Sequence, residues 1–99
     1  MQVHPAFVQA MQEKKMCILK DGHDNTRVAE PYGIFITRQK EIMYCCYQVA
    51  GYSGTKLPGW RNFHIEDINT VTITSRSFKK RSDFNPDNKD LYYQWAEKI

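Results

Sequence analysis

The sequence predicts a single, mainly β (α+β) domain: a small, strongly bent five-stranded sheet or open barrel with one helix before it and one after it. Short runs of β-branched and aromatic residues alternate with turn residues through most of the chain. Segments with apolar residues at helical spacing precede and follow these runs. The 99 residues, 41% of them hydrophobic, suffice for one core and therefore for one domain over residues 1–99.

The N-terminal segment predicts an amphipathic helix over residues 5–14. Pro5 suits the first helical turn, where its missing N–H group is not needed. Phe7, Ala10 and Met11 then recur at helical spacing.

The β candidates follow, with turns between them. Residues 21–25 are a strong turn signal, because Gly and Asn tolerate positive φ. Pro31 cannot donate to a strand ladder, so we expect it at an edge or at a bend. Residues 50–59 hold three of the five glycines and predict a loop long enough to be functional. The predicted strands are residues 16–20, 26–30, 32–38, 41–49, the segment after Gly59, and 70–74.

The C-terminal segment predicts a second helix from about residue 86 to 98. Asn85 offers an N-cap, and Pro86 would occupy the first helical position. Leu91, Trp95 and Ile99 then fall on one helical face at four-residue steps.

Composition and charge narrow the class of protein. The net charge of +3 permits an anionic partner without requiring one. No stretch approaches the roughly 18 apolar residues of a membrane span, and the first residues do not resemble a signal peptide. Three cysteines, an odd number, fit a reducing compartment. We expect a cytoplasmic protein that does not bind a membrane.

Residues that could perform catalysis or bind a metal are scattered. No Cys-x-x-Cys or His-x-x-x-His pair is present, so we predict no metal site and no cofactor. No nucleophile elbow and no phosphate-cradling glycine motif is present, so we do not expect an enzyme. Cys45 and Cys46 should face opposite sides of a strand as two small buried residues.

The stretch Leu57–Ile68 is the most informative part of the sequence. In a strand, Arg61 and Phe63 would share one face, and Trp60 would lie on the other. An arginine on an apolar face needs a partner, and two remain open: an ion pair, for example with Glu66, or an anionic ligand. Trp60 and Phe63 are predicted mainly as core residues.

Basic and aromatic residues would also suit single-stranded nucleic acid. Arg61 could supply charge, and Tyr47, Tyr52 and Trp60 could supply a stacking platform. The basic run Arg76–Arg81 adds charge, but we favour its interpretation as a solvated linker, since a net charge of +3 gives a weak field.

The order of these segments resembles the WYL domain, a family named for a Trp-Tyr-Leu strand motif. Residues 30–33, Glu-Pro-Tyr-Gly, are similar to the family's proline segment, and residues 42–44, Ile-Met-Tyr, stand where the family has its name motif. Residues 61–68 are similar to its Arg-x-Phe-Arg-Leu-Asp-Arg-Ile-like segment. His64 and Asp67 stand where the family commonly has further arginines, and the name triad itself is absent.

The resemblance implies an Sm-like, SH3-like β-barrel that binds nucleic acid or a nucleotide-like ligand and takes part in transcription regulation. We therefore expect a non-enzymatic, ligand-binding regulatory domain. Arg61, His64 and Tyr47 are its ligand-binding residues by resemblance, and Tyr52 joins them from the adjacent loop. The alternative is a protein–protein interaction module, either a homodimer or a domain that docks onto a larger complex.

Overall fold

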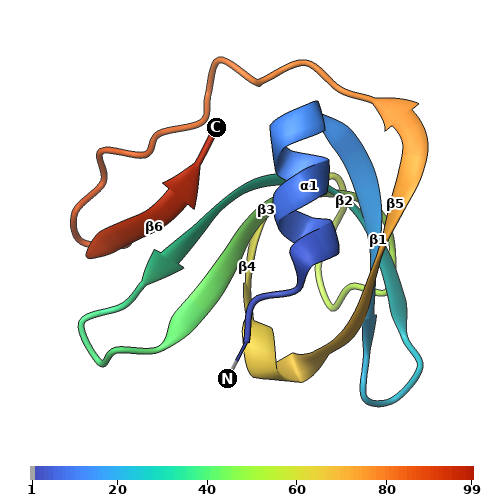
Figure 1. Cartoon of the computed structure of the whole chain (residues 1–99), viewed down its shortest axis with the longest axis horizontal. Coiled ribbons are helices and arrows are strands. Elements are labelled where there is room, and N and C mark those ends of the chain that lie inside the picture. The colour runs from blue at the N-terminus through green and yellow to red at the C-terminus, as the bar shows by residue number, and fades with distance from the viewer. Residues whose placement is uncertain (1) are drawn as a thin grey trace.

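A bent antiparallel sheet with one helix makes up the chain in a computed structural model that describes residues 2–99 (Figure 1). The mainly β class is therefore confirmed, and the sheet is not closed. The elements are α1 (Pro5–Glu13), β1 (Lys15–Asp21), β2 (Thr26–Ile36), β3 (Ile42–Gly51), β4 (Gly59–His64), the 3₁₀ turn η1 (Ile65–Asp67), β5 (Ile68–Ser77) and β6 (Gln94–Lys98). Within residues 2–99, no helix has the length and apolar character that a membrane crossing requires.

The central strand β2 organises the sheet. Five strands follow the order β4-β3-β2-β1-β5, and β6 is added beside β2. The first half of β2 pairs with β1 up to Ala29, and its second half, from Gly33 to Ile36, pairs with β6. Two predicted strands are therefore one long strand. The expected bend at Pro31 is confirmed, because the pairing of β2 with β3 shifts register between Pro31 and Gly33.

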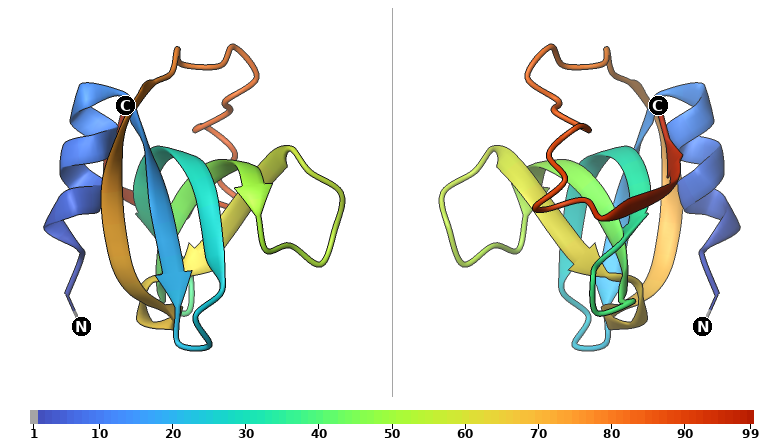
Figure 2. Two further views of the ribbon diagram at one scale, coloured as in Figure 1. Left: turned by 90° about the vertical axis from the view of Figure 1, so that its right-hand side faces the viewer. Right: turned by 90° about the vertical axis from the view of Figure 1, so that its left-hand side faces the viewer.

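The helix α1 forms where the sequence predicts it. Its C-cap, Lys14, adopts a left-handed conformation with φ 53°, and the chain then enters β1. Phe7 and Ala10 are fully buried, and the ring of Phe7 stacks on that of Tyr44 at a centroid distance of 3.9 Å. Figure 2 shows α1 lying across one side of the sheet, where it contacts β1, β2 and β5.

The predicted C-terminal helix is wrong, because residues 94–98 form the strand β6. Its four-residue apolar spacing does not describe a common face: Leu91 is exposed, while Trp95 packs against Phe35. The second half of β2 offers an edge that a strand can pair with and a helix cannot. Gly33 makes room for this pairing, since a Cβ there would lie 2.8 Å from the carbonyl oxygen of Glu97 and would collide with the ring of Trp95.

The sheet carries a hydrophobic core on each face. The inner core lies beneath α1, and the outer core lies beneath the segment that follows β5. In Figure 1 this segment arches away from the end of β5 and descends to β6. Cys46 belongs to the inner core and Cys45 to the outer one, as predicted for neighbours in a strand. Phe63 and Trp60 likewise pack on the inner and outer cores, respectively.

Candidate functional site

Asp21, at the end of β1, organises the turn into β2. Its carboxylate accepts hydrogen bonds from the backbone N–H groups of His23 (2.8 Å) and Asn25 (3.1 Å). It also accepts hydrogen bonds from the side chains of Asn25 (3.3 Å) and Arg27 (3.0 Å). Partial desolvation raises the pKa of Asp21, but these hydrogen bonds outweigh it and hold the pKa at about 2. The turn is therefore built around a carboxylate that stays ionised.

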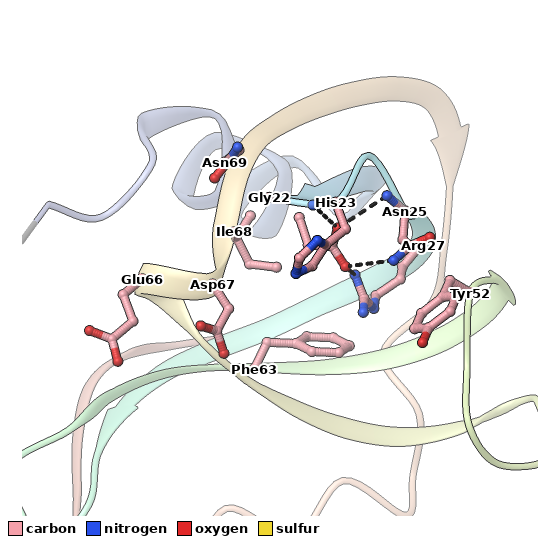
Figure 3. A pocket seen from close by; sticks show the side chains of 11 residues that line it. Gly22, His23, Asn25, Arg27, Tyr52, Phe63, Glu66, Asp67, Ile68 and Asn69 are labelled. Carbon is pink, nitrogen blue, oxygen red and sulfur yellow. Dashed lines mark hydrogen bonds and ion pairs between the residues drawn. The ribbon is translucent and has the colours of Figure 1, made fainter.

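Arg27 extends from this turn to a position between two aromatic rings. Its guanidinium carbon lies 5.1 Å from the ring centre of Tyr52 and 5.3 Å from that of Phe63, within cation–π range (Figure 3). Among residues 2–99, the one hydrogen-bond partner of this guanidinium is the carboxylate of Asp21. The side chain of Arg27 is 13% exposed, and its other N–H groups have no hydrogen-bond partner among these residues.

A hollow of about 510 Å³ opens beside Arg27. In Figure 3, Asp67 lies next to Phe63, on the side away from Tyr52, and the imidazole of His23 lies near the guanidinium of Arg27. The polar residues of the rim are Asp21, His23, Asn25, Glu66, Asp67 and Asn69. This end of the site is therefore rich in carboxylates and amides.

A second hollow of about 260 Å³ adjoins the first. The two share Arg27, Tyr52 and Phe63, and we call them together the Arg27 groove. The second hollow adds Arg61 from β4 and residues 53–55 of the loop, which in Figure 2 extends away from the sheet. Its lining contains two arginines and no carboxylate, so the groove is cationic at this end and acidic at the other.

Arg61 folds back onto the loop before β4. Its guanidinium donates hydrogen bonds to the carbonyl oxygens of Trp60 (2.8 Å) and Lys56 (2.9 Å) and to the hydroxyl of Thr55. Gly59 permits this, because a Cβ there would lie 2.6 Å from Arg61 Nη1. Within residues 2–99, Arg61 forms no ion pair, so the suggested pairing with Glu66 is wrong.

Two of the four predicted site residues meet in the Arg27 groove, and two lie elsewhere. Arg61 and Tyr52 line the same hollow. His64 lies at the other end of β4, where its Nδ1 is 3.1 Å from Glu41 Oε2. Tyr47 lies on the outer face of the sheet, where its ring is covered by Arg81.

Arg27, the centre of the site, carries no local signal in the sequence, where it is one residue of the predicted strand 26–30. Its pairing with Gly51 in β3 is what brings it next to Tyr52. Arg27 and Tyr52 could have been placed together only by predicting the register of β2 against β3.

The groove combines several kinds of recognition group. The groove offers aromatic faces, guanidinium donors and carboxylate acceptors. Among residues 2–99, no group of three or more His, Cys, Asp or Glu side chains is placed to hold a metal ion. The three cysteines are buried, and burial raises the pKa of Cys17 to about 12 and that of Cys45 to about 11, so these thiols are poor nucleophiles.

No protein-family model matches this chain, and searches of curated proteins and of solved structures find no similar protein. The WYL resemblance therefore stays a prediction.

Proposed function

We propose that the chain is a non-enzymatic binding domain for a nucleotide or a short single-stranded nucleic acid, held in the Arg27 groove. One observation carries this proposal: the exposed ring of Tyr52 lies beside the guanidinium of Arg27 and lines the same hollow as Arg61. Tyr52 is 55% exposed, which leaves much of its ring available to a base. Bases stack on aromatic rings, and guanidinium groups bind phosphate oxygens.

The charges of the groove orient this ligand. The phosphate belongs at the end with Arg61, whose charge is not balanced by a carboxylate and which lies near the hydroxyl of Thr55. The charge of Arg27 is partly balanced by Asp21, so Arg27 is better suited to hold the aromatic rings in place. Asp67 at the other end would repel a phosphate and can accept hydrogen bonds from amino groups of a base.

His64 and Tyr47 are left out of this site because neither lines the Arg27 groove. His64 lies beside Glu41 and lines a separate hollow. The guanidinium of Arg81 lies 3.7 Å from the ring centre of Tyr47 and occupies the face that a base would need.

The proposal extends to the fold family and to the cellular setting. We infer a small, open Sm-like, SH3-like barrel of WYL type that acts as a regulatory domain in the cytoplasm. An N-terminal helix, one meandering antiparallel sheet and a 3₁₀ turn before β5 support the fold. Arg61, Phe63 and Ile68 support the WYL type, since they match that family's segment by identity.

Tyr52 provides the first test. Fluorescence anisotropy would measure binding of short labelled single-stranded DNA and RNA, and of mononucleotides, at several salt concentrations. We expect Tyr52→Ala to weaken binding by about 1–3 kcal/mol for each stacked base, while Tyr52→Phe, which keeps the ring, binds like the wild type. Equal binding by Tyr52→Ala and the wild type would contradict the stacking role.

Arg61 separates phosphate recognition from general charge attraction in the same assay. We expect Arg61→Ala to weaken binding to all base sequences and to reduce the salt dependence by about one phosphate contact. Arg38→Ala is the matched control, because it removes the same charge from an exposed residue in the turn after β2. Circular dichroism would show whether Arg61→Ala stays folded. A folded Arg61→Ala that binds as well as Arg38→Ala would refute the phosphate site.

A protein–protein interaction module is the second candidate. One feature favours it: among the described residues, the outer edges of β4 and β5 pair with no strand. Free strand edges can pair with another chain.

A further inference from the structure

The outer edge of β5 lacks the usual protection against strand pairing. β5 pairs with β1 on one side and, within residues 2–99, with no strand on the other. From Ile68 to Ser75 it contains no charged residue, no proline and no glycine. Free edges are usually guarded by lysine, proline, bulges or an inward charge. Here register shifts flank the edge, but the stretch Thr70–Ile73 between them is regular.

The sequence of this edge is complementary to itself. Residues 69–75 read Asn-Thr-Val-Thr-Ile-Thr-Ser, and their character is symmetric about Thr72. An antiparallel copy centred there sets Val71 opposite Ile73 of the second copy and Thr72 opposite its own equivalent. Opposed β-branched side chains and opposed threonines are favourable cross-strand pairs.

Exposure agrees with an edge that can accept a further strand. Val71 and Ile73 pack on the inner core but are only partly buried, and Val8 on the neighbouring helix α1 is partly buried as well. Thr70 and Thr72 are exposed. A second strand would cover apolar surface on one face and threonines on the other.

Charges at the two ends of β5 favour the antiparallel direction. Glu66 and Asp67 precede the strand, and Arg76 lies near its end. Antiparallel pairing brings the acidic end of each copy to the basic end of the other, whereas parallel pairing would align like charges.

We propose that the chain forms a two-fold symmetric homodimer by antiparallel pairing of β5 with β5 of a second copy, centred at Thr72. The partner is a second copy because the edge matches itself in side-chain type and in charge. The contact adds a strand to the sheet of each copy and does not use Tyr52 or Arg61.

Charge substitutions at Thr72 test this pairing. Sedimentation velocity on the full chain over a range of concentrations should show a dimer for the wild type. Thr72→Lys and Thr72→Glu should each be monomeric, because two like charges would face each other across the two-fold axis. A mixture of the two variants should form the dimer again. A wild type that is monomeric at every concentration, a dimer that survives either substitution, or a mixture that stays monomeric would overturn the proposal.

Cross-linking gives an independent reading of the centre. The three native cysteines are buried, so a cysteine at position 72 supplies the accessible thiol. Under mild oxidation we expect Thr72→Cys to form a disulfide-linked dimer at least about tenfold faster than Thr70→Cys, because only residue 72 faces its own equivalent within disulfide reach. Equal rates for the two variants would place the two-fold axis elsewhere or remove it.

Discussion

Each face of the sheet carries an arginine that meets a carboxylate and aromatic rings, but the two clusters differ in how completely the arginine is satisfied. On the inner side, Arg27 has a single hydrogen-bond partner, Asp21, and lies in an open groove. On the outer side, Arg81 binds Glu30 through Nε and Nη2, both at 3.0 Å, and covers the ring of Tyr47. An arginine, a carboxylate and aromatic rings thus form an open site on one face and a closed structural cluster on the other.

The ion-pair cluster at Arg81 holds the segment after β5 against the outer core. Glu30 is 3% exposed, and the hydroxyl of Tyr32 also donates to it. The backbone N–H group of Arg81 donates to the same hydroxyl at 2.9 Å. The hydrogen bond to Glu30 raises the pKa of Arg81 and keeps it charged. No ligand is needed to complete this cluster, whereas Arg27 retains donors that a ligand can take.

Removing Arg81 should give the largest change in stability. Arg81→Ala leaves the buried carboxylate of Glu30 without its cation, and such a loss costs about 3–5 kcal/mol. We expect the lower end of that range, because Arg81 is itself 38% exposed. Urea unfolding monitored by tryptophan fluorescence measures it, and Arg81→Ala combined with Glu30→Gln should recover part of the loss. An unchanged urea midpoint in Arg81→Ala would show that the cluster does not stabilise the fold.

Removing Arg27 should cost less stability and more binding. In Arg27→Ala the carboxylate of Asp21 keeps the three hydrogen bonds from His23 and Asn25. We expect a loss of about 1.5–3 kcal/mol in the free energy of unfolding, as for one charge-assisted hydrogen bond. The oligonucleotide assay on the same variant should show weaker binding. If Arg27→Ala destabilised the chain as much as Arg81→Ala, Arg27 would form a second structural ion pair and would not be the centre of a binding site.

The ionised carboxylate of Asp21, on the Arg27 side, should make stability depend on acid pH. The folded pKa of Asp21, about 2, lies below its ordinary value of 3.8, so the folded state binds this proton more weakly than the unfolded state. The resulting stabilisation is complete above about pH 4 and is lost as the pH falls toward about 2. We expect the difference in unfolding free energy between the wild type and Asp21→Asn, from urea titrations, to shrink over this window. A difference that does not vary with pH would contradict the role given to the ionised carboxylate.

Local signals in the sequence predicted most of the strands and the first helix. The turn at residues 21–25 depends on residues close in sequence, and so does the alternation of Val71 and Ile73 in β5. The prediction of a C-terminal helix was wrong because residues distant in the sequence determine the structure of this segment. The free edge of β2 and the absence of a side chain at Gly33 select a strand, and neither can be found in the spacing of Leu91 and Trp95.

The site was predictable only as far as its residues are neighbours in sequence. Arg61 and Tyr52 were found because they flank one loop. Arg27 was missed because the register of β2 against β3 brings it to that loop from a distant part of the chain. The face on which Tyr47 lies was open to prediction by alternation, but its covering by Arg81 depends on the path of the last twenty residues.

The adjacent pair Cys45 and Cys46 gives the chain two built-in reporters. One thiol is sealed in the outer core and its neighbour in the inner core, and burial raises the pKa of both. A thiol reacts with an alkylating reagent only when its own surroundings open, so the two alkylation rates measure two opening equilibria one residue apart. Release of the segment after β5 would expose Cys45 alone, while exposure of Cys46 requires α1 to leave the sheet. The order in which the two faces come apart can thus be determined without labelling any other position.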